Sequence, residues 1–340
     1  MYSRSGVRRT RTNTILLLVV VLAIGALTAG AVIVGREAPS VTDSEQIPDR
    51  DRVIPLEGPR VVALQPGHWK IDELPPEHDG RDRGIGAVYG AVRELDINLA
   101  VVDALVPMLE ERGWTVIVVP ATVPPGLRAD VFVSVHADWA SDPNRRGWKL
   151  APPWRPSPAA RDLAESLRDA FAAREELRED AGGITVGMRG YFGFASHRYT
   201  HASSPYTPAV LVELGFVTNA SDRRRMLDRP DYYARIIAEG IERHLYTWSR
   251  ADTASLVPQT FETMVAGDTG GVVYRTRDRS GPVLRRLEPG DRVRPVDELE
   301  GWYEVRFWSR RGIGWVAAEE LVPYDRLVRD ERDEDERGRL

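Results

Sequence analysis

The sequence predicts an α/β protein in which a mostly parallel, twisted sheet carries helices on both faces, preceded by one transmembrane helix and followed by a small all-β barrel. Three observations support this fold class. Short apolar segments alternate with amphipathic ones between residues 60 and 248, as in parallel sheets with helical connections. An uncharged apolar run precedes this region. After residue 270 the segments become short and rich in Arg, Gly and β-branched residues.

The composition narrows the chemistry that the chain can perform. Its 340 residues are 42% apolar and 29% charged, which is ordinary globular composition with room for about two domains. The formal net charge of -5 gives no sign of a nucleic-acid footprint, so we expect no nucleic-acid partner. The chain has no cysteine, which excludes disulfides, thiolate nucleophiles and thiolate metal sites. Any metal must therefore bind to His and carboxylate side chains.

Residues 15–35 are long and apolar enough to cross a membrane. This run of 21 residues carries no charge, and at about 1.5 Å per residue a helix of it spans a bilayer core of about 30 Å. Four arginines in the basic segment 1–14 place the N-terminus in the cytoplasm by the positive-inside rule. A cleaved signal peptide with Ala29-Gly30-Ala31 as its small-residue site is the alternative, but the run exceeds a typical h-region. We therefore expect a single-pass anchor in the cell membrane, with the rest of the chain extracytoplasmic, on the periplasm or cell-wall side.

The α/β region, residues 60–248, follows a proline-containing linker at 36–59. Runs of Val, Leu and Ile indicate strands, whereas apolar residues at helical spacing indicate amphipathic helices. Pro107 interrupts the first helix and predicts a kink or an early end. In chain order we predict a strand at 60–64, a helix from 95 to a stop at Gly113, strands at 116–119 and 131–135, a helix at 159–174, a strand at 209–212 and a helix at 232–246.

The residues after Trp248 form three further segments. A linker at 249–269 precedes the all-β module, which we assign to 270–325 because its short strands are separated by SGP, EPGD and EGWYEV. The last segment, 326–340, mixes both charge signs densely with few apolar residues. We expect it to be a solvated, charged tail.

Three ionisable residues follow or end predicted strands, at the carboxyl edge where open parallel sheets form their sites. His68 follows the first strand, His136 ends the third and Glu213 ends the last. Glu213 interrupts the apolar stretch PAVLVELGF, where an unpaired carboxylate costs on the order of several kcal/mol and so needs a partner or a catalytic role. Glu94 begins the first amphipathic helix, where a carboxylate gains from the helix N-terminus.

Two histidines and a glutamate, with a second glutamate held apart, match the requirements of a hydrolytic zinc site. Three protein ligands leave a fourth position for water, whose pKa falls to about 7, and the spare carboxylate shuttles the proton. Each residue also has a structural explanation. His68 could be a loop residue, His136 a half-buried imidazole, Glu94 a helix-start charge and Glu213 one half of a buried ion pair. The presence of all four residues together favours the zinc site over four separate structural explanations.

Four sequence blocks between residues 60 and 247 resemble the zinc-dependent N-acetylmuramoyl-L-alanine amidases of the family-3 type. These enzymes cleave the bond between the lactyl group of N-acetylmuramic acid and L-alanine in peptidoglycan. The blocks are PGH at 66–68, Glu94 followed by Asn98, ADVFVSVHAD at 129–138 and PAVLVELGFVTN at 208–219.

The resemblance implies a phosphorylase/hydrolase-like α/β fold, a Zn²⁺ cofactor and peptidoglycan as substrate. Matched residue by residue, it implies that His68, Glu94 and His136 are the zinc ligands and that Glu213 is the catalytic glutamate. The sequence identifies no regulatory protein partner.

The chain departs from the family pattern around His68 and between two strands. Gln65 stands where the family has Asp before Pro-Gly-His, and Trp69-Lys70 stand where it has Gly-Gly. The segment after the second strand, which in the family carries an Arg and an Arg-bearing helix, is shortened to PATVPPGLRAD at 120–130. The shortening affects substrate contacts rather than the predicted metal site.

Several further residues have both a functional and a structural interpretation. His201 could contact substrate or stabilise an oxyanion, although a solvent-exposed loop His is the ordinary interpretation. Trp139, Trp148 and Trp154 could stack on a sugar or pack a lid, with core packing as the default.

The module at 270–325 resembles bacterial SH3-like domains, which are often attached to wall hydrolases. RSGPVLRRLEPGDRV at 279–293, GWYEVR at 301–306 and GIGWVAAEELV at 312–322 carry this resemblance. It implies binding of wall peptide or glycan through exposed aromatic and basic residues. We also expect at least one of Trp302 and Trp315 to belong to the core of the small barrel.

Two other functions remain compatible with the residues. One is a non-catalytic wall-binding scaffold with a decayed amidase fold. The other is a zinc carboxypeptidase-like peptidase acting on wall peptides, whose His-x-x-Glu ligand spacing is absent because 26 residues separate His68 from Glu94.

Overall fold

The computed structural model describes residues 53, 55–78, 84–307 and 312–324. The chain divides into Met1–Pro48 and Asp49–Leu340, and all described residues belong to the second unit. The predicted basic segment 1–14, transmembrane helix 15–35 and charged tail 326–340 lie outside the described residues, as does most of the linker 36–59. Among the residues that the structure describes, no helix combines the length and apolar character needed to cross a membrane.

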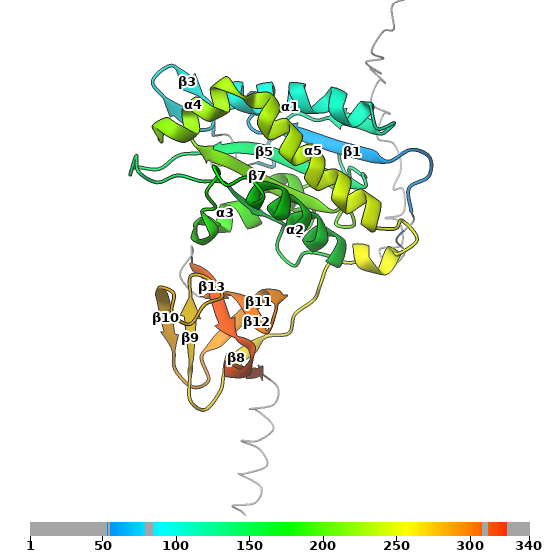
Figure 1. Ribbon diagram of the computed structural model, residues 1–340. Helices are drawn as coiled ribbons and strands as arrows, with labels where there is room; N and C mark the ends of the chain where they lie inside the picture. The colour runs from blue at the N-terminus through cyan, green and yellow to red at the C-terminus, as the bar shows by residue number, and fades with distance from the viewer. Residues whose placement is uncertain (1–52, 54, 79–83, 308–311, 325–340) are drawn as a thin grey trace, which may run out of the picture. The chain divides into compact units, whose positions relative to one another are not determined.

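A five-stranded sheet forms the centre of the α/β region (Figure 1). Its strand order is β4 (Thr115–Val118), β1 (Val61–Pro66), β5 (Val131–Asp138), β7 (Ala209–Phe216) and β6 (Lys149–Ala151). The first four strands are parallel, and β6 pairs antiparallel with β7 at the edge. The predicted mostly parallel α/β sheet is therefore confirmed. The sequence does not predict β6, because three residues that include a lysine give no apolar run.

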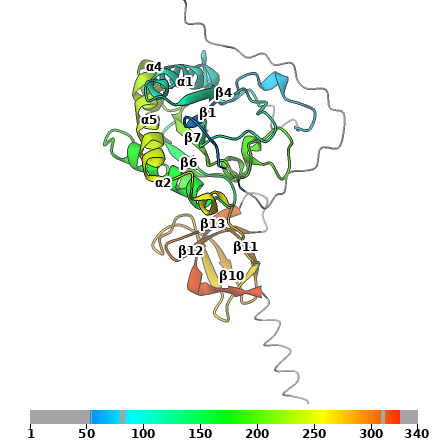
Figure 2. The same cartoon turned by 90° about the vertical axis from the view of Figure 1, so that its right-hand side faces the viewer.

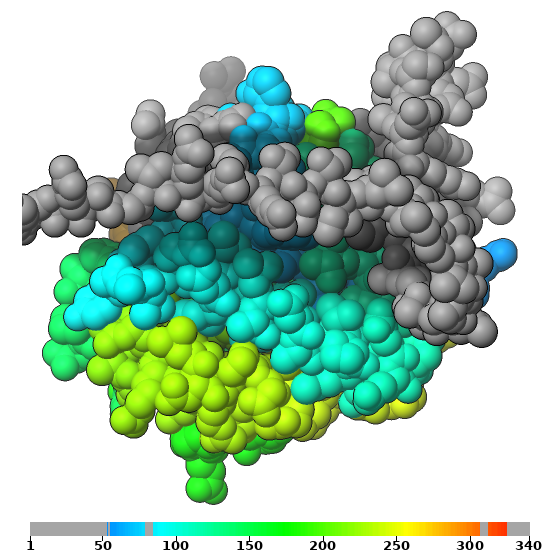
Figure 3. Space-filling model, turned by 90° about the horizontal axis from the view of Figure 1, so that it is seen from above, coloured from blue at the N-terminus to red at the C-terminus, as the bar shows by residue number. Residues whose placement is uncertain are grey.

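Three long helices cover one face of this sheet and share a single buried core (Figure 2). They are α1 (Glu94–Glu110), α2 (Pro158–Ala172) and α5 (Pro230–Thr247). Helix α2 begins where the Ser157 side chain accepts the N–H of Ala160, a capping bond that satisfies a free backbone donor. On the surface seen from above, α1 lies beside the yellow-green segment of α4 (Ala220–Asp228) and α5 (Figure 3).

The opposite face is covered by short helices and loops. Helix α3 (Val186–Arg189) and the 3-10 helix η3 (Phe192–Phe194) pack with the loops around them against Phe132 and Leu211. The expectation of helices on both faces is therefore confirmed only in part: long helices cover one face, and short helices and loops cover the other. The chain covering the second face includes residues 181–207, where five glycines disfavour a continuous helix.

Strand side chains alternate between these two faces. Val62, Val133 and Val212 belong to the core under the long helices. The alternate residues Ala63, Phe132 and Leu211 belong to the second core. Gln65, His136 and Glu213 share the parity of this second set, so the strands present them to the face covered by loops.

Helix α1 continues past Pro107 to Glu110, so an early end at the proline is not observed. A proline at this position cannot donate a hydrogen bond to the carbonyl of Asp103, four residues earlier. Both Asp103 and Pro107 lie on the exposed side of the helix. Water can therefore satisfy the free carbonyl, which explains why the helix tolerates the proline.

The C-terminal residues form a seven-stranded antiparallel sheet in the order β10-β9-β13-β12-β11-β8-β14, here called the β-module. It begins at Met264 rather than at residue 270, because β8 lies within the predicted linker and pairs with β11 and β14. Its strands are β8 (Met264–Ala266), β9 (Gly271–Tyr274), β10 (Val283–Leu287), β11 (Arg292–Leu299), β12 (Trp302–Phe307), β13 (Gly312–Ala317) and β14 (Leu321–Pro323).

The core of the β-module consists of aliphatic side chains from β8 to β14, such as Val273, Val305 and Val316. Neither Trp302 nor Trp315 belongs to it, since both are only half-buried. The expectation that at least one of these tryptophans is a core residue is wrong, because the small aliphatic residues fill the interior.

The remaining elements are short. They are η1 (Ile71–Glu73), β2 (Val88–Tyr89), β3 (Val92–Arg93), η2 (Ala181–Gly183), η4 (Thr253–Leu256) and η5 (Ala318–Glu320).

Buried polar contacts join the β-module to the α/β region within the unit Asp49–Leu340. Arg189 of α3 is 4% exposed and forms ion pairs with Asp297, at 3.4 Å, and with Glu304, at 2.5 Å. The N–H of Arg155 donates to the carbonyl of Val296 at 2.9 Å. Asp297 also pairs with Arg161 of α2.

Candidate metal centre and catalytic cleft

His68 lies in a tight turn directly after β1. Its φ of 65° places it in the left-handed region, which residues other than glycine rarely adopt. The preceding Gly67 donates its N–H to the carbonyl of Val135 at 2.8 Å, and a Cβ at this glycine would lie 2.4 Å from the ring of His136. Nδ1 of His68 lies 2.6 Å from the carbonyl oxygen of Gly84. Because a carbonyl only accepts, Nδ1 carries the proton and Nε2 keeps its lone pair.

Glu94 is buried at the start of α1 and is held by backbone donors. Its Oε2 accepts the N–H of Ala87 at 2.7 Å, and its Oε1 accepts the N–H of Ala137 at 3.1 Å. The Asn98 side chain, one helical turn later, donates to the same Oε1 at 3.4 Å. Burial opposes ionisation, but the interactions with the side chains of His136 and His68 outweigh it and hold the pKa of Glu94 well below its usual range.

His136 is buried on β5 between Glu94 and Ser134. Its Nδ1 lies 2.9 Å from Oε1 of Glu94, and its Nε2 lies 3.1 Å from Oγ of Ser134. The rings of His136 and His68 meet edge to face with their centres 5.0 Å apart. Burial lowers the pKa of His136, which favours the neutral imidazole that binds metals.

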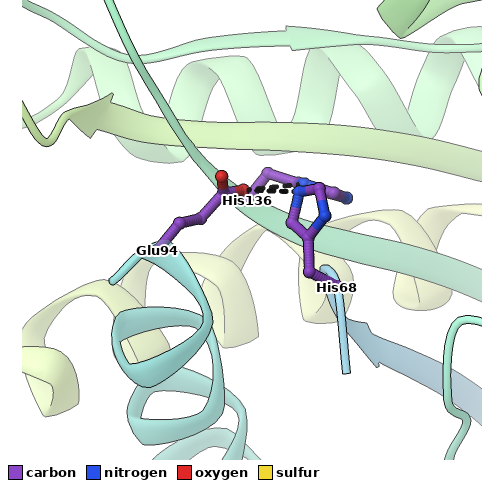
Figure 4. A group of neighbouring side chains, drawn as sticks. All are labelled: His68, Glu94 and His136. Atoms are coloured by element: carbon purple, nitrogen blue, oxygen red, sulfur yellow. Dashed lines mark hydrogen bonds and ion pairs between the residues drawn. The ribbon is translucent and has the colours of Figure 1, made fainter. Parts of the chain in front are cut away.

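His68, Glu94 and His136 direct three donor atoms to one point (Figure 4). Oε1 of Glu94 is 3.3 Å from Nε2 of His68 and 2.9 Å from Nδ1 of His136, and all three donor atoms lie within 4.8 Å of one another. Ligand atoms of a tetrahedral zinc site with bonds near 2.0–2.1 Å are about 3.3 Å apart. Two imidazole nitrogens and a carboxylate oxygen at these separations fit a zinc ion, and the sequence predicts these three residues.

Glu213 stands beside these residues on β7. It pairs in register with His136 of β5 on one side and with Lys149 of β6 on the other, so the three side chains form a row on one face of the sheet. Its Oε2 is buried and has no hydrogen-bond partner among the described residues. Burial raises the pKa of Glu213 well above its ordinary value, and the charges of Asp138 and Glu94 raise it further.

The sequence of residues 62–243, more than half of the chain, matches the family described as N-acetylmuramoyl-L-alanine amidase. The chain belongs to this amidase family. Among curated proteins it is 25% identical over 228 residues to AmiC, an N-acetylmuramoyl-L-alanine amidase of Neisseria meningitidis serogroup B. The match covers 53% of this chain and 54% of AmiC, so the chain spans about half the length of this curated relative.

Two solved amidase structures are also similar to the chain. Ami1 from Mycobacterium smegmatis is 21% identical, with a TM-score of 0.40, and the match covers 56% of this chain and 98% of Ami1. The catalytic domain of CwlV from Bacillus (Paenibacillus) polymyxa var. colistinus is 24% identical, with a TM-score of 0.37, and the match covers 56% of this chain and 99% of that one.

Lys149 is a buried residue of the amidase-family region that the sequence does not single out. It is 1% exposed, forms an ion pair with Asp138, and its Nζ lies 3.4 Å from Oδ2 of Asp180. Lys149 is thus the nearby cation that a structural role for Glu213 requires, but its ion pairs go to the two aspartates. A lysine between Trp148 and Leu150 is the one signal in the sequence that could have revealed it.

The structure also places three other residues for which the sequence left a functional and a structural interpretation open: His201, Trp148 and Trp139. His201 forms an ion pair with Glu77 at 2.7 Å, and the backbone N–H groups of Thr200 and His201 also bind this carboxylate. These bonds outweigh desolvation and lower the pKa of Glu77 to about 2. Trp148 is 1% exposed in the main core, as expected by default. Trp139 is 52% exposed, so it does not pack in a core.

An open cleft of about 1370 Å³ adjoins His68, His136 and Glu213. Trp154 lines it, as does Trp315 of the β-module. The lining also contains Arg145, Arg198, Arg275 and Arg306. These four arginines outnumber Glu213 and Glu304, the carboxylates of the lining, so the cleft carries an excess of cationic side chains, which suits a substrate that carries carboxylate groups.

Proposed function

We propose that the chain is a zinc-dependent N-acetylmuramoyl-L-alanine amidase that hydrolyses the amide between the lactyl group of N-acetylmuramic acid and L-alanine in peptidoglycan. One observation carries the proposal: three donor atoms converge beside Glu213, whose Oε2 is buried without a hydrogen-bond partner among the described residues, within the region that matches the amidase family. His68, Glu94 and His136 would hold the zinc ion, and Glu213 would be the catalytic residue.

The residues of the chain divide the reaction between them. Bound zinc would supply a Lewis acid that polarises the scissile carbonyl and lowers the pKa of water. Glu213 takes the proton of the attacking water and then delivers it to the departing amine of L-alanine, so it acts first as base and then as acid. Its raised pKa suits this role, because it makes the carboxylate a stronger acceptor for the water proton, which the resulting carboxyl group then donates to the amine.

Incubation of the full chain in detergent with purified peptidoglycan, with and without a zinc chelator, tests this function. Mass spectrometry should detect stem peptides with a free L-alanine amine, and the chelator should abolish them. Zinc restored to the chelated protein should return the activity. Cleavage within the stem peptide would instead identify a peptidase, and a folded protein that binds no zinc and releases no product would identify a scaffold.

We also propose that residues 15–35 anchor the chain in the cell membrane, with the amidase-family region and the β-module on the extracytoplasmic side. The uncharged run and the four arginines before it support this topology. The full chain should stay with the membrane pellet after alkaline carbonate extraction, and protease added outside intact spheroplasts should digest residues after 36. Release into the supernatant would show that the run does not anchor the chain.

We propose further that the β-module is an SH3-like domain. Its support is the small antiparallel sheet with an aliphatic core, together with the three sequence stretches at 279–293, 301–306 and 312–322. The half-buried Trp302 and Trp315 leave part of their rings available to wall peptide or glycan.

A further inference from the structure

Gln65 and Ser134 form a buried polar cluster behind His136. Both side chains are 0% exposed, on the sheet face where the apolar residues Ala63, Phe132 and Leu211 lie one step earlier along their strands. The parallel register of β1 and β5 places Gln65 directly beside Ser134, which explains why the two side chains meet. Buried polar groups are stable only when hydrogen-bonded, so the partners of each atom can be assigned one by one.

The orientation of the Gln65 amide is fixed by a backbone carbonyl. Its Nε2 donates to the carbonyl oxygen of Pro120 at 2.8 Å, an atom that can only accept. Oε1 therefore points toward Ser134, whose hydroxyl donates to it at 2.9 Å, and toward Tyr191, whose hydroxyl donates to it at 2.7 Å. A Ser134 hydroxyl turned away from Oε1 would leave two oxygen lone pairs facing each other at this distance.

The same reasoning assigns the donor of the hydrogen bond between Ser134 and His136. Since the single hydroxyl proton of Ser134 is given to Gln65, its oxygen can only accept from Nε2 of His136, 3.1 Å away. Nε2 then carries the ring proton, and Nδ1 keeps the lone pair that faces Glu94. The Gly84 carbonyl fixes His68 in the complementary form, with its lone pair on Nε2.

We infer that the sequence of hydrogen bonds His136–Ser134–Gln65–Pro120, here called the relay, sets the tautomer of His136 and so presents Nδ1 to a metal ion. Gln65 and Ser134 are thus positioning residues for the candidate zinc site. The inference rests on the proposed zinc site but not on the substrate. The Pro120 carbonyl fixes which atom donates in each hydrogen bond of the relay, because it can only accept. A residue at position 65 must therefore both donate to this carbonyl and accept from Ser134. A glutamine amide does both, whereas a carboxylate cannot donate.

Zinc affinity of the full chain, measured by competition with a chelating dye, provides the first test. Ser134→Ala should weaken zinc binding by about 10- to 100-fold, as loss of a hydrogen bond to a metal-bound histidine typically does. Gln65→Leu removes the acceptor that orients the Ser134 hydroxyl, so it should weaken zinc binding in the same direction. Tyr191→Phe is the matched control, since it removes the second donor to Gln65 Oε1 and leaves the relay intact. It should bind zinc within about threefold of the wild-type chain.

Proton NMR of the cobalt-substituted full chain supplies a readout that a general loss of packing would not mimic. The relay predicts two shifted, exchangeable ring N–H signals, from Nδ1 of His68 and Nε2 of His136. Ser134→Ala and Gln65→Leu should lose the His136 signal alone, through faster exchange with water, while Tyr191→Phe keeps both.

The two readouts separate this inference from the proposed function. A wild-type chain that binds neither zinc nor cobalt would overturn the zinc site itself. A wild-type chain that binds zinc, with both signals retained in Ser134→Ala or Gln65→Leu, would overturn the relay and leave the amidase proposal standing.

Discussion

Glu213 and Glu94 both lie beside His136, but their surroundings are opposite. Both oxygens of Glu94 accept backbone N–H groups, and its pKa is held low. Glu213 has a buried Oε2 without a hydrogen-bond partner among the described residues, and its pKa is raised. The first environment stabilises a permanent anion suited to ligation, and the second suits a group that exchanges a proton.

Glu213→Gln should therefore lower turnover without removing the metal. Glutamine keeps the shape of the side chain but cannot accept and return a proton, so we expect kcat to fall by at least about 100-fold. Zinc content, measured by mass spectrometry of the purified variant, should stay at the wild-type value. Full activity in this variant would show that another group moves the proton.

Lys149→Met should shift the pH dependence of catalysis. Lys149 lowers the pKa of Glu213, against the larger opposing effects of burial, Asp138 and Glu94. Its removal should raise the pKa of Glu213 further, and Glu213 must be deprotonated to act as the proposed base. We therefore expect the acidic limb of the kcat/KM profile to move to higher pH, while Arg168→Met, whose ion pair is with Glu179, leaves it in place. An unmoved limb in Lys149→Met would show that this lysine does not influence the group that the limb reports.

At the residue scale, the sequence predicts His68, Glu94, His136 and Glu213 because each falls at a strand end or helix start, in a short block that resembles the amidase family. It does not predict Lys149 or the partners of Gln65. Lys149 lies on a three-residue edge strand, and the contacts of Gln65 depend on the register of β1 against β5. Register between strands separated by about 70 residues in the chain leaves no local pattern.

The turn between β1 and η1 carries His68, so the candidate metal centre depends on its backbone. A Gly67→Ala change would place a Cβ 2.4 Å from the His136 ring, and the surrounding strand leaves that ring little room to move. We expect a loss of about 1–3 kcal/mol in the free energy of unfolding, together with weaker zinc binding.

Gly187→Ala in α3 is the matched control for this substitution. Its Cβ would meet only Thr185 Oγ1, at 3.6 Å, which is ordinary contact, so urea unfolding should be unchanged or slightly more stable. Equal stability of Gly67→Ala and the wild-type chain would show that the turn relaxes around the added methyl group.

At the element scale, long periodic segments are predictable and short ones are not. The three long helices and four parallel strands have clear apolar periodicity, so the sequence places them within a few residues of their observed bounds. The segments over the other face are stabilised by tertiary packing of Phe192, Phe194 and Tyr199 rather than by periodicity. Their course could not be deduced from local pattern.

The unit Asp49–Leu340 contains a titrating group at the contact between the α/β region and the β-module. Burial raises the pKa of Glu304 to about 7, although Arg189 lies 2.5 Å away and opposes the shift. An acid whose pKa is higher in the folded state binds its proton more tightly there. Its contribution to stability is therefore complete below pH of about 4.5 and is lost as the pH rises through about 7.

Urea midpoints of the full chain should accordingly fall between pH 5 and pH 8. The Glu304→Gln variant, which cannot ionise, should show a smaller fall over the same range. Glu319→Gln, which removes an exposed carboxylate of the β-module paired with Arg279, should behave like the wild-type chain. Identical pH dependence in Glu304→Gln and the wild-type chain would contradict the assignment.

The Arg189 ion pairs also have a consequence for truncated chains and for chains in which the β-module is exchanged for another domain. Arg189 belongs to the amidase-family region, yet the carboxylates that pair with it come from β11 and β12 of the β-module. A chain cut after Trp248 would retain Arg189 and lose both carboxylates. The Arg189 guanidinium, buried in the full chain, would then be left as an unpaired charge on the new surface. Exchange of the β-module for one from another hydrolase would have to preserve acids at positions 297 and 304, or replace Arg189 as well.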